Sequence, residues 1–221
     1  RKFVIQTVHR ILVRCSNADQ FSLPHQLLTQ LFAQVCVIGN LLGNDIGSAG
    51  QRVLCRFHAL FGIDVGCGAG FPGVPLAIAC PEAKITLLDS LGKRMAWLEQ
   101  ILPQLGVEAE CITARAEEFA EKRRETYDFA TSRAVARLNI LLELTAPFVK
   151  VGGAVLAMKG SAAREELEEA KNAISKLGLK LETVADFPVD GTAHSVIVLR
   201  KIRPTPAQYP RRYAKIKQSP L

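Results

Sequence analysis

Residues 63–73 read IDVGCGAGFPG, an apolar run followed directly by a turn that carries glycines at positions 66, 68 and 70. Glycine adopts positive φ at little cost and has no Cβ, so such a turn lets a ligand approach the main chain. In an open parallel sheet, ligands bind beyond the carboxyl ends of the strands. The segment therefore predicts a ligand site directly after a first strand, with a glycine turn that holds no ligand as the alternative.

The chain around this turn alternates short apolar runs with amphipathic segments, the pattern of an α/β fold. The sequence predicts strands at 61–65, 84–89, 109–113, 127–131, 154–159, 179–184 and 195–201. It predicts helices at 74–80, 93–102, 116–122, 136–148 and 164–177. Residues 185–194 are too few for a helical crossover, so we expect the last two strands to be antiparallel. The expected fold is α/β and Rossmann-like, a seven-stranded, mostly parallel sheet with one antiparallel strand.

Composition divides the chain into three parts, with the α/β domain expected over 61–202. Residues 1–60 form an N-terminal extension, in which only 23–42 have a helical pattern. Residues 203–221 form a basic tail. The chain carries a net charge of +7, and from 200 onward there are basic residues and no acids: Arg200, Lys201, Arg203, Arg211, Arg212, Lys215 and Lys217. Such blocks contact nucleic acid or another anionic surface, and an untethered solvated tail is the alternative.

Length and composition exclude several classes of protein. A chain of 221 residues, 48% hydrophobic and 22% charged, is typical of one globular domain. No apolar run reaches the roughly 20 residues of a membrane-spanning helix. The six cysteines are scattered, with no CxxC pair, which argues against both a metal site and a disulfide framework and favours a cytoplasmic protein. The acid-poor opening leaves an organelle transit peptide as the alternative.

The glycine spacing alone leaves the ligand open. Counted from Gly66, which directly follows the strand, Phe71 replaces the third glycine of a dinucleotide fingerprint, whereas a count from Gly68 satisfies it. Pro72 removes an N–H from the helix start that would hold a pyrophosphate, which favours a ligand without phosphates. Asp89 ends the second strand, where a carboxylate can accept both hydroxyls of an adenosine ribose. This position suits NAD and S-adenosylmethionine equally, and a strand-end capping aspartate is the alternative.

Several segments, in order, resemble the motifs of the bacterial RsmG (GidB) family. They are DVGCGAGFPGVPL (64–76), LLDS (87–90) followed by Lys93 and Arg94, RAEE (115–118), SRA (132–134), MKG (158–160) and the basic ending TPAQYPRR (205–212). The resemblance covers about residues 64–221. It implies a class I methyltransferase fold over 61–202 and transfer of a methyl group from S-adenosylmethionine to guanine N7 in small-subunit (16S) ribosomal RNA.

The resemblance also implies which residues contact the cofactor. They are Gly66, Phe71, Ala116, Glu117 and Arg133, and Gly68 and Asp89 complete the expected set. A structural ion pair is the alternative role for Arg133. We expect no catalytic acid or base, because guanine N7 has a free lone pair at neutral pH and loses no proton before attack on the methyl group.

The expected partner is 16S rRNA or the small ribosomal subunit, bound by a monomer that uses neither a membrane nor a metal. Tyr209 and Tyr213 lie among the basic residues of the tail, which fits RNA contact, and Lys93 and Arg94 could assist at phosphates or form a solvated face. Two family segments that precede the turn, Asn-Leu-Thr and His-x-x-Asp-Ser, are absent from 1–60. The alternatives are therefore an RNA-binding protein of the same fold that has lost catalysis, or an NAD-dependent oxidoreductase, although the sequence offers no group that would handle a hydride.

Overall fold

The computed structural model describes residues 60–189 and 192–221. The extension expected over 1–60 and its helical pattern at 23–42 therefore lie outside the described residues, apart from Leu60. None of the helices in the described ranges combines the length and the apolar character that crossing a membrane requires.

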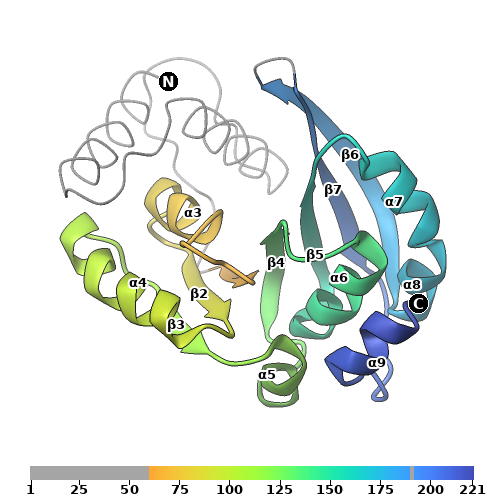
Figure 1. Cartoon of the computed structure of the whole chain (residues 1–221), viewed down its shortest axis with the longest axis horizontal. Coiled ribbons are helices and arrows are strands. Elements are labelled where there is room, and N and C mark those ends of the chain that lie inside the picture. The colour runs from red at the N-terminus through yellow and green to blue at the C-terminus, as the bar shows by residue number, and fades with distance from the viewer. Residues whose placement is uncertain (1–59, 190–191) are drawn as a thin grey trace.

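The described chain builds one seven-stranded sheet in the order β3-β2-β1-β4-β5-β7-β6 (Figure 1). The strands are β1 (Phe61–Val65), β2 (Lys84–Asp89), β3 (Glu110–Thr113), β4 (Tyr127–Arg133), β5 (Val149–Lys159), β6 (Leu179–Val189) and β7 (Thr192–Lys201). The first five strands pair in parallel, and β7 runs antiparallel to both of its neighbours. The predicted fold class, with one antiparallel strand, is confirmed.

Helices cover both faces of this sheet. They are α3 (Gly73–Ala79), α4 (Gly92–Leu105), α5 (Ala116–Lys122), α6 (Leu138–Thr145) with the 3₁₀ turn η1 (Ala146–Phe148), α7 (Ala163–Glu169), α8 (Lys171–Lys176) and α9 (Tyr213–Gln218). The single helix predicted over 164–177 is wrong, because the chain divides into α7 and α8 at Ala170. The helix predicted over 136–148 starts two residues later and tightens into η1 at Pro147, which has no N–H to donate to an α-helical bond.

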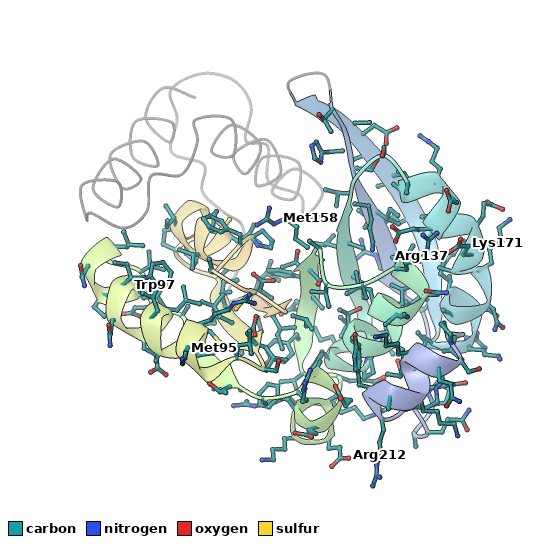
Figure 2. The ribbon with its side chains drawn as sticks, in the orientation of Figure 1. Met95, Trp97, Arg137, Met158, Lys171 and Arg212 are labelled. Atoms are coloured by element: carbon teal, nitrogen blue, oxygen red, sulfur yellow. The ribbon has the colours of Figure 1, made fainter. Side chains whose placement is uncertain are left out.

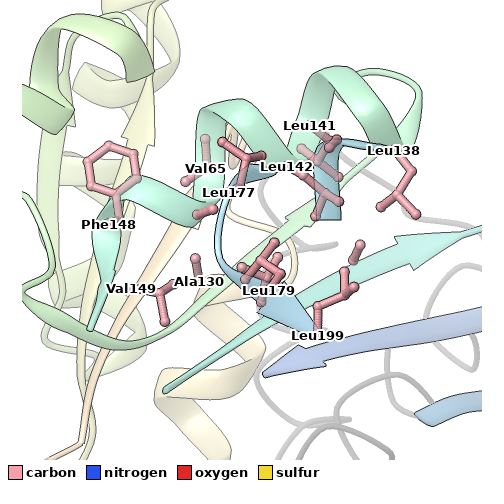
Figure 3. Close-up of a cluster of buried hydrophobic side chains, with 14 of the residues drawn as sticks. Val65, Ala130, Leu138, Leu141, Leu142, Phe148, Val149, Leu177, Leu179 and Leu199 are labelled. Atoms are coloured by element: carbon pink, nitrogen blue, oxygen red, sulfur yellow. The ribbon is translucent and has the colours of Figure 1, made fainter. Parts of the chain in front are cut away.

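Two hydrophobic clusters lie on opposite faces of the sheet. Consecutive residues of one strand alternate between them: Leu87 belongs to the cluster under α3 and α4, and Leu88 to the cluster under α5 to α8. Figure 3 shows the second cluster around Phe148 and Leu142, and Figure 2 shows Met95 of the first. Strands buried on both faces read as continuous apolar runs, which is why the central strands were recognisable in the sequence.

The C-terminal residues pack against the domain, so the alternative of an untethered tail is wrong. Lys201 is fully buried, and its Nζ donates to the carbonyls of Ala146 and Val149, at 2.8 and 3.0 Å. Arg211 pairs with the buried carboxylate of Glu143 on α6, with an Nη2 to Oε2 distance of 2.6 Å. The chain end is thereby attached to the core on the side of α6.

The tail docks where the parallel strands begin. Arg124, just before β4, donates to the carbonyl oxygens of Tyr209 and Pro206 at 2.7 and 3.0 Å. The Thr205 hydroxyl donates to the carbonyl of Leu177, just before β6, at 3.1 Å. The tail is therefore held at the amino edge of the sheet, opposite the edge that carries the glycine turn.

Candidate functional site

The order of the strands places a topological switch beside β1. The chain first builds outward from β1 to β2 and β3, then returns to place β4 on the other side of β1. Ligands of open α/β sheets bind at such a switch, beyond the carboxyl ends of the strands. Gly66 follows β1 and Arg133 ends β4, so both expected site residues lie at the switch.

The glycine turn that follows β1 has an unusual backbone. Gly66, Gly68 and Gly70 have φ angles of +71°, +59° and +89°, a region that residues with a Cβ rarely adopt. The amides of Gly66 and Cys67 both donate to the carbonyl of Leu88 on β2, at 2.8 and 3.1 Å. These bonds attach the turn to β2, so the turn is a fixed part of the sheet edge.

The two sides of the turn differ in the space they leave. A Cβ built on Gly66 would lie 2.4 Å from Cγ2 of Val135, so the segment after β4 closes over this glycine. A Cβ built on Gly68 would meet its nearest atom, Nη1 of Arg94, only at 4.0 Å. The side-chain face of Gly68 is therefore open to a ligand, whereas the same face of Gly66 is filled by Val135.

Asp89 is almost fully buried and faces the turn. Its Oδ2 accepts the Gly68 amide at 3.0 Å, and Nη1 of Arg94 lies 3.5 Å from the same oxygen. Its Oδ1 accepts the amide of Leu91, the residue that caps α4, at 2.9 Å. Asp89 thus performs the strand-end capping role and also lies at the turn. Each carboxylate oxygen has two lone pairs, so Asp89 keeps acceptor capacity for ligand hydroxyls.

Asp64 is a candidate site residue that was not predicted from the sequence. It is fully buried within β1; its Oδ2 accepts the amide of Gly73 at 2.8 Å, while its Oδ1 has no hydrogen-bond partner among the described residues. Burial raises the pKa of Asp64 to about 7, although the Gly73 bond and the charge of Arg133 both lower it. The signal that could have found it is a carboxylate in the middle of the apolar strand FGIDV, since a buried carboxylate requires a reason.

Arg133 and Phe71 lie together across the switch. The guanidinium carbon of Arg133 lies 5.8 Å from the centroid of the Phe71 ring, a cation–π contact. Burial lowers the pKa of Arg133, and the charge of Asp64 partly restores it. No carboxylate among the described residues forms an ion pair with Arg133. The structure therefore does not support the alternative role of Arg133 in a structural ion pair, and its contact is with the Phe71 ring.

Ala116 and Glu117 begin α5, directly beyond β3. Thr113 of β3 pairs with Asp89, and the amide of Ala114 donates to the Asp89 carbonyl at 3.1 Å. Ala116 and Glu117 are half-buried at this edge. The seven expected cofactor residues therefore lie at or just beyond the ends of four adjacent strands, along one edge of the sheet. Across the described ranges, no group of three His, Cys, Asp or Glu side chains could hold a metal ion.

Comparisons with known proteins give matches over most of this chain. The family model of rRNA small subunit methyltransferase G matches residues 52–194. A protein of Clostridium novyi (strain NT) named Ribosomal RNA small subunit methyltransferase G is 47% identical over 164 residues, which are 72% of this chain and 68% of that relative. The protein of the same name from Alkaliphilus metalliredigens (strain QYMF) is 44% identical over 164 residues, 72% of this chain and 69% of the relative.

Solved structures share the fold at low sequence identity. TYW2 of M. jannaschii, in complex with AdoMet, superposes with a TM-score of 0.61 at 13% identity, over 83% of this chain and 80% of that one. A variant 16S rRNA adenine-N1 methyltransferase from Catenulisporales acidiphilia, with cosubstrate SAM, gives 0.56 at 15% identity, over 67% and 88%. These likenesses show the class I methyltransferase fold.

Proposed function

Because the chain belongs to the rRNA small subunit methyltransferase G family, we propose that it transfers a methyl group from S-adenosylmethionine to guanine N7 in 16S rRNA. The observation that carries the cofactor assignment is the open side-chain face of Gly68 beside Asp89. The preceding strand adds Asp64, whose buried Oδ1 has no hydrogen-bond partner within the described part of the chain. A ligand with sugar hydroxyls and positively charged groups matches these two carboxylates, and S-adenosylmethionine has both.

The residues present fit this cofactor better than a dinucleotide. The amide of Gly73, the first residue of α3, donates to Asp64, and the amide of Val74 donates to the Gly70 carbonyl at 2.7 Å. Those are the donors that would hold a pyrophosphate, and the carboxylate of Asp64 would repel one. The arrangement supports a positively charged ligand and argues against the NAD-dependent alternative.

Each expected residue has a role in holding the cofactor. Asp89 accepts the ribose hydroxyls, and ionised Asp64 balances positive charge. Gly68 offers the ligand a face with no side chain, and Gly66 contributes its backbone while Val135 fills the space on its side-chain face. Ala116 and Glu117 lie beyond β3, where they would border the adenine. Phe71 and Arg133 would border the cofactor on the opposite side, between β1 and β4. When bound, the sulfonium supplies an electrophilic methyl group.

The chain's own contribution to methyl transfer is alignment. Guanine N7 attacks with a free lone pair, so no residue has to remove a proton, and we assign no catalytic acid or base. Alignment of a nucleophile with its target can lower a barrier by roughly 7–11 kcal/mol. The glycine turn after β1, which is hydrogen-bonded to β2, and the contact of Arg133 with Phe71 provide a rigid edge for this purpose.

The basic tail supports contact with RNA through a smaller set of residues than its composition suggests. Arg200, Lys201, Arg203 and Arg211 are held by protein groups. Arg212, Lys215 and Lys217 at α9 are exposed, and Figure 2 shows Arg212 directed away from the body of the protein. We assign phosphate contacts to these three, on a monomer that acts on the 16S rRNA or the small subunit in the cytoplasm.

Two measurements test the proposed function. Titration calorimetry with S-adenosylmethionine and with NAD should show binding of S-adenosylmethionine only; tighter binding of NAD would contradict the proposal. Incubation of 16S rRNA or small subunits with methyl-labelled S-adenosylmethionine should then label one guanine at N7. RNA binding without incorporation would favour an RNA-binding protein that has lost catalysis.

A further inference from the structure

The segment between β4 and α6, residues 133–137, is fixed at both ends. At its start, the hydroxyl of Ser132 donates to the carbonyl of Val65 at 2.7 Å. At its end, Nζ of Lys159 donates to the carbonyl of Ala136 at 2.6 Å. Between them Ala134 has a φ of +56°, a conformation that costs a residue with a Cβ free energy and persists only where the surroundings hold it.

One ion pair fixes the second end. Lys159 is the last residue of β5 and is 9% exposed, and its Nζ lies 2.8 Å from Oε2 of Glu166 on α7. The same Oε2 accepts the amide of Leu138, the first residue of α6, at 2.8 Å. Lys159 and Glu166 therefore join the end of β5 and the start of α6 to α7 through charge-assisted hydrogen bonds.

The exposed side of the segment has weaker support. Arg137, labelled in Figure 2, donates to Glu165 at 2.8 Å and to Glu169 at 2.7 Å. All three side chains are more than 40% exposed, and ion pairs between exposed groups contribute little to stability. The buried pair of Lys159 and Glu166 is therefore the main restraint on this end.

The fixed segment presents two side chains to the glycine turn. Arg133 lies over the Phe71 ring, and Val135 closes over Gly66, as the 2.4 Å approach to a built Cβ shows. A shift of the segment would move both side chains relative to the turn. Small displacements of groups that border a reacting centre cost much of the benefit of alignment.

We propose that Lys159 and Glu166 are positioning residues of the cofactor site, acting through Arg133 and Val135. Their buried ion pair holds the strained segment 133–137 against the glycine turn before any ligand binds. This inference rests on the proposed function for the identity of the ligand, whereas the restraint itself is a property of the free protein.

Hydrogen exchange of the free protein tests the restraint. Lys159→Met should raise exchange at the amides of residues 134–138 by about tenfold or more. The substitution removes the bonds of Lys159 to Glu166 and Ala136, so local opening of the segment costs less free energy. Glu166→Gln keeps an oxygen that can accept the Leu138 amide, so it should raise the exchange rate of these amides less than Lys159→Met does. Lys171→Met, which removes an exposed pair with Glu168 at the α7–α8 junction, is the matched control and should leave these amides unchanged. Unchanged exchange in both Lys159→Met and Glu166→Gln would overturn the proposal.

A double-mutant cycle on the affinity for S-adenosylmethionine tests the link to Arg133. We expect Arg133→Ala to weaken binding about tenfold in the natural protein but only about twofold when combined with Lys159→Met, because the segment is already displaced. If Lys159 has only a structural role, Arg133→Ala should weaken the affinity for S-adenosylmethionine by the same factor with or without Lys159→Met. That result would overturn the proposal. If the natural protein bound no S-adenosylmethionine, the proposed function would fail, and the exchange measurement would still decide the role of the pair.

Discussion

At the scale of single residues, the carboxylate of Asp64 links burial to ligand chemistry. It is buried inside a strand, one of its oxygens has no hydrogen-bond partner among residues 60–189 and 192–221, and burial raises its pKa to about 7. Because the neutral form is favoured on folding, the protein binds more protons folded than unfolded between pH 4 and 7. Its contribution to the free energy of unfolding therefore falls as the pH rises through this range.

This titration predicts a pH-dependent affinity for the cofactor. Binding of a positively charged ligand favours ionised Asp64, so the affinity for S-adenosylmethionine should rise by up to about tenfold per pH unit below 7 and level off above it. Asp64→Asn should bind more weakly at pH 8 and lose this dependence, as calorimetry between pH 5.5 and 8.5 would measure. Asp89→Asn is the control and should keep the dependence. The same rise in Asp64→Asn would disprove the assignment.

The open side-chain face of Gly68 gives a second prediction. Gly68 and Gly106 have similar φ angles, +59° and +66°, and both have room for a Cβ. Gly68→Ala and Gly106→Ala should each cost about 1 kcal/mol of stability, from backbone strain alone. Only Gly68→Ala should weaken S-adenosylmethionine binding, which urea unfolding and calorimetry together would show. Equal affinities in the two variants would place the ligand elsewhere.

At the scale of elements, α6 serves as an anchor for the chain end. Its Glu143 is fully buried and accepts from both the backbone amide and the guanidinium of Arg211, at 2.9 and 2.8 Å to Oε1. Tyr209 and Ile216 are buried nearby in the sequence, so the ending contributes to the core. The tail is thus an element of the fold that also exposes cations.

Removal of the Arg211 side chain should therefore destabilise the whole domain. Arg211→Ala leaves the buried carboxylate of Glu143 without its charge partner, which typically costs about 3–5 kcal/mol. The exposed pair of Lys171 and Glu168 provides the comparison, and Lys171→Ala should change stability by no more than about 0.5 kcal/mol. Urea unfolding monitored by circular dichroism would measure both. Similar losses in the two variants would contradict the anchoring role.

At the scale of the whole molecule, the basic C-terminal tail and the proposed cofactor site lie on opposite edges of the sheet. The glycine turn is at the carboxyl edge, whereas the tail docks at the amino edge. An RNA that touches both would have to extend along the domain, since the seven residues of β4 alone span roughly 20 Å. Deletion of the tail is a poor test of this contact, because it would also remove buried residues.

Replacement of the three exposed cations is the cleaner test. Changing Arg212, Lys215 and Lys217 together to Gln should weaken 16S rRNA binding and reduce the slope of log affinity against log salt by about 2–3, one condensed counterion for each lost phosphate contact. Affinity for S-adenosylmethionine should not change. The matched control exchanges Arg212 for Lys and both lysines for Arg, which keeps the charge and should keep the slope. An unchanged slope in the Gln variant would remove α9 from the RNA interface.

The sequence was sufficient to predict the fold class and the positions of the central strands. Parallel strands buried on both faces produce apolar runs, so β1 and β2 were predicted with the bounds that the structure shows. The ends of helices were harder to predict. The chain divides into α7 and α8 at Ala170, and no Gly or Pro in the sequence indicates that division. The placement of the glycine turn and Asp89 next to each other followed from their position at strand ends.

Tertiary structure alone decided which charges are buried and which are free. Arg211 and Arg212 are neighbours in a basic block, yet one pairs with a buried carboxylate and the other faces solvent. Likewise, Arg137 meets Glu165, 28 residues further along the chain, only because the start of α6 lies beside α7. The periodicity of apolar residues indicates which face of a helix or strand is buried, and it depends only on residues close together in the chain. The partner of a charge depends on contacts between distant segments, which exist only once the sheet is assembled.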